Sequence, residues 1–259
     1  MMPNYAKTQR LSLGMMATHL VFLAIFLGLW QFAVVQGWVD QTFFGSPRGI
    51  VMFLFDGFLG STALWRELAW SLGGTLAAFV LGSVAAVLAA LVFINYPGVE
   101  KFAEPYLSAL NSMPRIALVP LFILWFGLGL ASKIAMGFTL TFFIVLSSAV
   151  AGIRGVSQDH LTLTSTLDAR PRQIFSLVTL PNAVPVIFSG LRLGLVYALL
   201  GVIGSEIIAS EHGLGQQISY LASTFNMNGV LALLIVLAAL ATSINYSMSR
   251  LEKHLLRWQ

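Results

Sequence analysis

The residue types and spacings that usually carry catalysis or metal binding are scarce in this chain. It has no cysteine, and its four histidines lie in separate segments, which is a poor arrangement for a metal site. It also lacks the GxxxxGK[ST] phosphate loop, the HExxH zinc motif and the GxSxG nucleophile motif. We therefore predict that the chain is not an enzyme, has no catalytic residue and holds no metal or cofactor. Any ATP that it depends on must be bound by another chain.

Charged residues inside apolar runs are the remaining candidates, because burying one in a bilayer costs about 2.5–3.5 kcal/mol. Arg192 and Glu206 stand near opposite ends of one apolar run. Either both side chains reach the two membrane interfaces, or Glu206 shapes or gates the outer mouth of a solute path. Trp125 lies in another apolar run, where it either lines a path or packs against neighbours. Trp125 and Glu206 are therefore candidate path or gate residues.

The composition explains why charged residues are so few. The chain is 58% hydrophobic and only 9% charged, with a mean hydropathy of +0.85, whereas globular domains are roughly a quarter charged. This composition predicts an integral membrane protein. The net charge of +4 is small and scattered along the chain. Basic residues that flank apolar runs suit lipid headgroups, so we expect contacts with membrane lipids and none with nucleic acid.

Six runs are long enough, or nearly so, to cross a membrane, which takes roughly 17–25 residues. They make one transmembrane domain over residues 1–259, with spans at about 13–35, 69–93, 115–130, 133–152, 184–208 and 229–249. The first run is too long for the apolar part of a cleaved secretory signal, typically about 7–15 residues. The third run is short and contains Pro120, Gly127 and Gly129, so we expect its helix to end or bend early.

Lys and Arg predict the orientation of these spans. With the N-terminus in the cytoplasm, all but three of the fourteen basic residues lie inside or at the inner interface, and Arg115 is among them. The three that remain outside are Arg48, Arg66 and Lys133. This positive-inside bias places both termini in the cytoplasm. Residues 95–114 then form an inner connection, residues 36–68 form an outer segment with Ser46-Pro47 as a turn or helix start, and Glu211 to Gly215 mark an outer turn.

The stretch from Asp159 to Arg192 is the longest piece too polar to cross the membrane, and it predicts a cytoplasmic docking element. After Pro171, its apolar and polar residues separate onto two sides of a short helix. We expect Pro181 and Pro185 to end this helix before the next apolar run. Seven residues follow the pattern LP-x-x-x-P-x-I-x-x-GLR: Leu180, Pro181, Pro185, Ile187, Gly190, Leu191 and Arg192. This pattern resembles the signature loop of binding-protein-dependent ABC importer permeases.

Other pieces are similar to the sulfonate, taurine and nitrate branch of that family. These are Ser46-Pro47, the run from Pro114 to Ile134, Gly152, and Ser205-Glu206 followed by Gly213-Leu214-Gly215. The resemblance implies an all-α integral membrane protein with the type I ABC importer permease fold, in which a coupling helix lies within about residues 157–183. It also implies a second permease copy, most simply as a homodimer, and cytoplasmic ATPase subunits that bind ATP and Mg²⁺. A periplasmic or lipid-anchored solute-binding protein is implied outside, so the location is the bacterial cytoplasmic (inner) membrane.

The resemblance also assigns roles to residues of this loop. Those expected at the ATPase contact are Thr166, Leu167, Asp168, Ala169, Arg170 and Arg172, and those that frame the loop are Pro181, Pro185, Gly190 and Arg192. Three departures stand out. Thr162-Leu163-Thr164 replaces the family's Glu-Ala-Ala, Asp168 replaces a glycine, and Arg170 replaces a capping serine. Asp tolerates the left-handed turn that glycine permits, whereas Arg cannot accept hydrogen bonds from helix N–H groups.

The expected cargo is a small anion such as a sulfonate, taurine or nitrate. The same branch includes importers for thiamine-precursor pyrimidines, riboflavin and aromatic acids, which remain the alternatives. A secondary transporter should show an inverted repeat or several midplane charges, and the sequence indicates neither. A scaffold without a transport role would have no reason to carry the signature loop.

Overall fold

A computed structural model of the chain describes residues 13–255, apart from the side chains at 13, 158, 161 and 165. Every regular element within these residues is helical. The helices are α1 (Leu13–Val35), α2 (Gln41–Phe44), α3 (Pro47–Phe55), α4 (Ala63–Asn95), α5 (Pro97–Ser112), α6 (Val119–Phe126), α7 (Leu130–Arg154), α8 (Gln158–Thr166), α9 (Pro171–Ile174), α10 (Leu180–Ile208), α11 (Leu214–Ser223) and α12 (Met227–Leu255). Two π-helical turns, Asp56–Gly60 and Phe175–Thr179, and one 3₁₀ turn, Arg115–Leu118, join some of them.

Five helical segments of the described chain are long and apolar enough to cross a membrane, and a bent pair makes a sixth. The bent pair joins α5 to residues 115–126 at an angle of 91°. The predicted span at 115–130 is thus only the second limb of this pair. Residues 97–112, which the sequence suggested were a connection, form the first limb. Glu100, Lys101 and Glu104 make α5 too polar for a hydropathy pattern to reveal it as part of a span.

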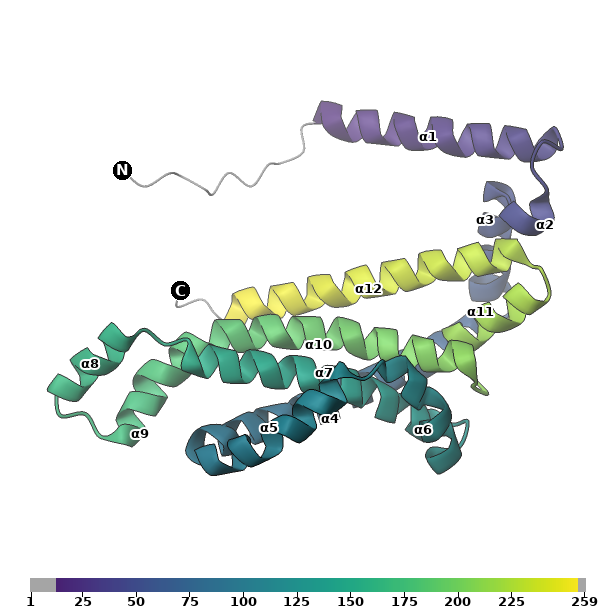
Figure 1. Cartoon of the computed structure of the whole chain (residues 1–259). Coiled ribbons are helices and arrows are strands. Elements are labelled where there is room, and N and C mark those ends of the chain that lie inside the picture. The colour runs from purple at the N-terminus through teal and green to yellow at the C-terminus, as the bar shows by residue number, and fades with distance from the viewer. Residues whose placement is uncertain (1–12, 256–259) are drawn as a thin grey trace.

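The core of the bundle consists of α4, α7 and α10, which pack along their lengths, with α12 and α11 against α10 (Figure 1). Small residues bring α7 and α10 close together. A Cβ on Gly201 of α10 would lie 3.0 Å from the Cα of Gly137 of α7, so the two backbones meet where neither has a side chain. Close approach at small residues is how membrane helices gain packing energy without a hydrophobic driving force.

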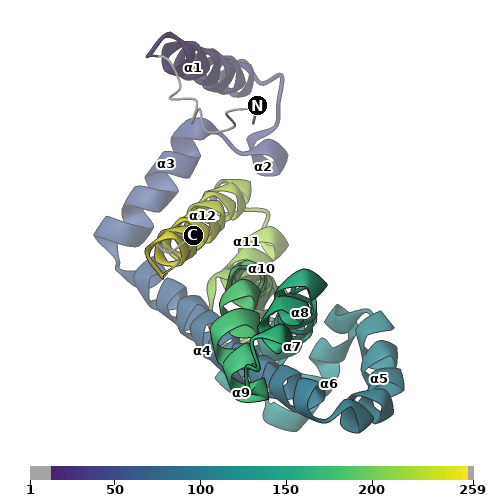
Figure 2. The same cartoon turned by 90° about the vertical axis from the view of Figure 1, so that its left-hand side faces the viewer.

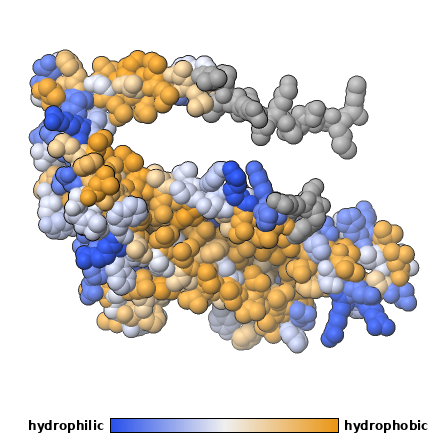
Figure 3. All heavy atoms as spheres, turned by 180° about the vertical axis from the view of Figure 1, so that it is seen from behind, coloured by the Kyte–Doolittle hydropathy of each residue, from blue (hydrophilic) through white to orange (hydrophobic). Residues whose placement is uncertain are grey.

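The two ends of the bundle differ in what they carry. In Figure 1, α8 and α9 lie at one end with the end of α12, and α2, α3 and α11 lie at the other. Figure 2 looks along the bundle from the end that carries α8 and α9. In Figure 3, hydrophobic residues cover the middle of the molecule and hydrophilic residues gather near its ends. This distribution suits a bilayer, and the end of α12 lies toward the same side as α8 and α9.

α1 stands apart from the other long helices and, among the described helices, packs mainly against α3 (Figures 1 and 2). None of its apolar span is buried within the chain. α3 connects α1 to the bundle. Its N-terminus lies at Ser46-Pro47, where the sequence predicted a turn or helix start. Ser46 is the N-cap, its Oγ accepts the Gly49 N–H at 3.1 Å, and Pro47 takes the first helical position. At α2, the Thr42 N–H donates to the exposed Asp40 carboxylate, which lowers the pKa of Asp40.

Candidate functional site

The coupling segment, residues 157–183, forms a helix, a turn and a second helix at one end of the bundle (Figure 1). The turn follows α8 and contains Asp168, whose φ of +57° lies in the left-handed region. The Ala169 N–H donates to the Thr164 carbonyl at 3.3 Å, which closes the helix end as in a Schellman motif. The expectation that Asp168 adopts the glycine-like conformation of the family's turn is therefore confirmed.

The second helix of the coupling segment begins without a side-chain cap from Arg170, as its residue type predicts. Arg170 has an extended backbone, and its own N–H donates to Gln173 Oε1 at 2.8 Å, which supplies half of a capping box. Arg170 and Arg172 are exposed. So are three leucines of this polar segment, Leu163, Leu167 and Leu177, which are 61%, 73% and 73% exposed. Exposed apolar side chains beside free cations are typical of a protein docking surface.

The two prolines after α9 do not end its helix, and this corrects the sequence prediction. The backbone continues from Pro171 through the π-turn Phe175–Thr179 into α10, so that residues 171–208 form one helical segment. A wider turn gives room to a proline ring that would otherwise press on the preceding turn. Asn182 Nδ2 also donates to the Val178 carbonyl at 2.7 Å and adds a side-chain hydrogen bond to this irregular turn.

The frame residues Gly190 and Arg192 hold α10 against its neighbours. A Cβ on the buried Gly190 would lie 2.2 Å from the Cβ of Ser148, so only glycine lets α10 pack this closely on α7. The Arg192 guanidinium pairs with Glu252 of α12. The GLR part of the pattern therefore fixes the first half of α10 to both α7 and α12.

Glu206 lies in a buried polar network at the opposite end of α10, where it is 1% exposed. Its Oε1 lies 3.4 Å from Lys133 Nζ of α7, and its Oε2 accepts from Ser71 Oγ at 2.8 Å and from the Gly215 N–H at 3.0 Å. Lys133 Nζ also donates to the His212 carbonyl. Lys133, which the sequence assigned to the outside, is thus the buried partner of Glu206.

A second carboxylate completes this network from α4. Glu67 Oε2 accepts the Gly213 N–H at 2.7 Å and lies 3.6 Å from His212 Nδ1, while Arg66 pairs with Oε1 at 3.0 Å. The Leu214 N–H donates to Ser71 Oγ at 2.9 Å. The first N–H groups of α11 therefore point at two carboxylates and a hydroxyl, an arrangement that satisfies the orphan donors and suits the helix dipole.

The buried polar network determines what Glu206 can do. Its carboxylate is committed to Lys133, Ser71 and the start of α11, so it fixes the turn at residues 211–215 to α4 and α7. The suggestion that it gates a solute path stays a prediction. A sequence signal for the pair did exist, since Lys133 and Glu206 are opposite charges inside apolar runs, and such charges commonly pair in membranes.

Trp125, the other candidate path residue, lies on α6 and is 62% exposed. Its ring packs against those of Phe122 and Phe126, with centroid distances of 6.3 and 6.4 Å. Phe122 in turn packs inward with Val119 and Met136. Trp125 therefore presents an apolar surface outward from the bend of the broken span, and its path role stays a prediction.

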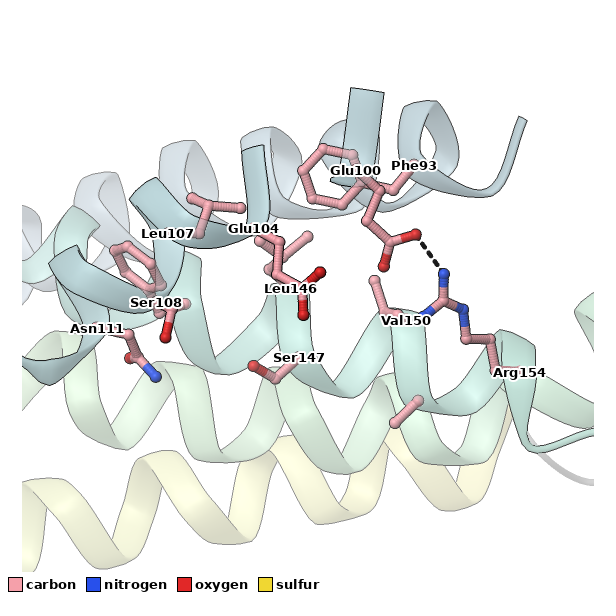
Figure 4. Close-up of a pocket in the computed structure, with 12 residues that line it drawn as sticks. Phe93, Glu100, Glu104, Leu107, Ser108, Asn111, Leu146, Ser147, Val150 and Arg154 are labelled. Carbon is pink, nitrogen blue, oxygen red and sulfur yellow. Dashed lines mark hydrogen bonds and ion pairs between the residues drawn. The ribbon is translucent and has the colours of Figure 1, made fainter. Parts of the chain in front are cut away.

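A pocket of about 480 Å³ opens between α5 and α7 (Figure 4). The Glu100–Arg154 ion pair marks one end, and Asn111 marks the other. Glu104, Ser108 and Ser147 point into the space between them. The pocket thus places several polar side chains along the first limb of the broken span.

Comparison with known proteins agrees with this geometry. Residues 78–257 match the family model described as the binding-protein-dependent transport system inner membrane component. An aliphatic sulfonates transport permease, the putative SsuC of Bacillus subtilis, is 31% identical over 93% of this chain and 87% of its own length. The taurine transport permease TauC of Escherichia coli is 28% identical (91% and 87%), and the riboflavin transport permease RibX of Chloroflexus aurantiacus is 30% identical (92% and 89%).

Solved structures show the same fold at lower identity. A chain of the MetNI methionine ABC transporter, in inward-facing conformations, aligns with a TM-score of 0.59 at 18% identity, over 74% of this chain and 93% of that one. The helical architecture is therefore that of ABC importer permeases, as the sequence pattern predicted. With a family model that covers most of its length and relatives that match nearly end to end, the chain belongs to the family of binding-protein-dependent transport system inner membrane components.

Proposed function

We propose that this chain is the membrane permease subunit of an ABC importer for a small anionic solute, and that separate ATPase subunits drive it by docking on the coupling segment. The observation that carries the proposal is the exposed surface of that segment, which is directly continuous with α10. Movement of a docked ATPase would therefore act on the bundle core. ATP and Mg²⁺ would be bound by the ATPase and not by this chain.

The cargo proposal rests on relatives of this chain. Permeases named for aliphatic sulfonates and taurine are 31% and 28% identical to it, and both names describe anionic sulfonate groups. Riboflavin and formylaminopyrimidine permeases are each 30% identical, which keeps a neutral heterocycle as the second candidate. The presence of a cation at the middle of the bundle, described below, favours the anion.

The remaining partners follow from the same proposal. A second copy of this chain would complete the path, most simply as a homodimer, and a periplasmic or lipid-anchored binding protein would deliver the solute. The positive-inside distribution supports placement in a bacterial cytoplasmic membrane with both termini in the cytoplasm. The coupling segment then faces the cytoplasm, where the ATPase subunits are.

The docking proposal can be tested with two single variants of the coupling segment. Leu167→Asp removes an exposed apolar contact and Arg172→Glu reverses an exposed charge, so both should reduce solute uptake per ATP hydrolysed at unchanged membrane abundance. The permease would be purified with its ATPase and binding protein and reconstituted in liposomes. Leu251→Asp and Lys101→Glu are matched controls, because both change exposed residues outside the coupling segment. Unchanged co-purification and coupling in Leu167→Asp and Arg172→Glu would contradict the proposal.

The cargo can be tested in the same liposomes. Uptake of a labelled alkanesulfonate, with competition by taurine and nitrate, is the expected result. Riboflavin serves as the neutral comparator. If riboflavin alone is taken up, the anionic cargo is wrong and the neutral heterocycle becomes the proposed cargo.

A further inference from the structure

Arg115 stands at the bend of the broken span and reaches the middle of the bundle. The two limbs meet at 91°, and Arg115 is the first residue of the 3₁₀ turn that opens the second limb. Its Cζ lies 4.7 Å from the ring centre of Phe143, which is near the midpoint of α7. The sequence had placed this cation at the inner interface. A break that brings a charged residue to mid-depth is typical of solute sites in transporters.

The charge of Arg115 has no carboxylate partner among the described residues, in contrast to three other cations of the long helices. Lys133 pairs with Glu206, Arg154 with Glu100, and Arg192 with Glu252. The polar contact of Arg115 is to the neutral Asn111 amide oxygen, and its buried Nε has no hydrogen-bond partner. A half-buried guanidinium with unused donors is costly unless an anion occupies its surroundings.

A cavity of about 420 Å³ adjoins this guanidinium. Its polar lining comes from Asn111, Arg115 and Tyr197, and the rest is apolar, including Met136, Leu140 and Leu200. Tyr197 lies near the midpoint of α10 and is 40% exposed. Ligand sites in proteins are typically concave and mostly apolar, with a few convergent polar groups that orient the ligand. This cavity has that character, with Arg115 as its charged group.

The cavity also adjoins the pocket described above. Asn111 lines both the 420 Å³ cavity and the 480 Å³ pocket, whose far end is marked by Arg154 (Figure 4). Glu104 in that pocket forms no ion pair with Arg115 among the described residues, since the guanidinium contacts Asn111 instead. A solute held at Arg115 therefore lies at the inner end of one cavity and at the start of another.

We propose that Arg115, with Tyr197, forms an anion-binding position midway along the transport path, which takes sulfonate, carboxylate or similar oxyanion groups. The proposal rests on the transport function proposed above. The guanidinium lies over the Phe143 ring, and one terminal nitrogen contacts Asn111, so its remaining terminal N–H donors are available to the oxygens of an oxyanion. The Tyr197 hydroxyl supplies a further donor on the facing helix. The carboxylate of Glu104 in the adjoining pocket disfavours an anion there, so the binding position is confined to Arg115 and Tyr197.

The test uses the reconstituted permease, ATPase and binding protein, with labelled ethanesulfonate as the probe. Arg115→Gln should lower ethanesulfonate uptake about tenfold or more, since charged hydrogen bonds to the anion are lost. Arg115→Lys should retain a substantial part of the uptake, and Tyr197→Phe should reduce it severalfold. Arg250→Gln is the matched control, because it removes an exposed arginine of α12 that packs on Tyr246. ATPase stimulation by the loaded binding protein, measured in parallel, shows that Arg115→Gln is folded and coupled.

The outcomes separate this proposal from the proposed function. Wild-type uptake of ethanesulfonate that persists unchanged in Arg115→Gln would overturn the anion position while leaving the importer function intact. An equal loss of ethanesulfonate uptake and of ATPase stimulation in Arg115→Gln and Arg115→Lys would assign Arg115 a structural role and overturn the proposal. Wild-type uptake of riboflavin without any sulfonate would overturn both the anionic cargo and the position.

Discussion

Lys133 and Glu206 form an ion pair that is almost completely shielded from solvent, with 3.4 Å between Nζ and Oε1 and side chains that are 2% and 0% exposed. The pair joins α7 to α10 beside the start of α11. Because two charges so placed are already removed from water, losing either one leaves the other uncompensated. The pair therefore stabilises the fold only as a unit.

This pair predicts a specific pattern of stability losses. Lys133→Met and Glu206→Gln should each lower the free energy of unfolding by about 3–5 kcal/mol, and the double variant should lose less than the sum. Thermal unfolding of the purified permease in detergent measures these losses. Lys101→Met, an exposed change on α5, should cost less than about 0.5 kcal/mol. Additive losses in the double variant would show that the two side chains act independently.

Gly190 predicts a helix-packing defect that a second change relieves. Gly190→Ala places a Cβ 2.2 Å from the Ser148 Cβ, so we expect a loss of about 1–3 kcal/mol in the free energy of unfolding. Ser148→Gly in the same chain removes the clash and should recover part of the loss. Gly73→Ala is the matched control, because nothing lies within 4 Å of its new Cβ. A Gly190→Ala permease as stable as wild type would refute the packing role.

Variants of Asp168 can separate the effect of its left-handed backbone conformation on transport from the effect of its charge. Asp168→Gly and Asp168→Asn should both keep the φ of +57° and retain transport. Asp168→Val should cost about 1–2 kcal/mol locally, distort the turn and reduce uptake per ATP hydrolysed. Reconstituted transport and ATPase rates measure this. Equal coupling in the glycine and valine variants would show that the left-handed turn is not required.

The ion pair between Arg192 and Glu252 predicts that exchanging the two charges restores part of the stability lost in either single variant. Arg192→Glu and Glu252→Arg each place like charges between α10 and α12, and each should cost roughly 1–2 kcal/mol. The loss is smaller than for Lys133 and Glu206 because the Arg192 side chain is 33% exposed and partly screened. The double reversal should regain thermal stability. If the swapped chain were no better than the single variants, the two residues would not be interacting.

Local patterns in the sequence predict the parts of this structure that depend on neighbouring residues. The runs behind α1, α4, α7, α10 and α12 are uniformly apolar, so hydropathy alone identifies them. The cap at Ser46-Pro47 and the left-handed turn at Asp168 follow from residue type at one position. The LP-x-x-x-P-x-I-x-x-GLR pattern identified residues 157–183 as a surface element and not as part of a span.

Features that depend on distant residues were missed. α11 begins at Leu214 because Glu67 and Glu206, from two other helices, satisfy its first N–H groups. No local pattern contains that information. α5 was missed because its polar residues face a pocket instead of lipid, which hydropathy cannot distinguish from a loop. The continuation through Pro181 depends on a π-turn that prolines alone do not predict.

The backbone from Pro171 to Ile208 is one continuous helical segment that joins the coupling segment to the buried polar network around Glu206. Its 38 residues reach roughly 57 Å if they are straight, which exceeds the thickness of the hydrocarbon core. The first end carries the exposed Arg172, which we propose contacts an ATPase, and the other end carries Glu206, the carboxylate that anchors the turn before α11. If this segment tilts as a rigid body, a movement of its first turn displaces Glu206 at the other end directly. No side chain between them has to change its rotamer.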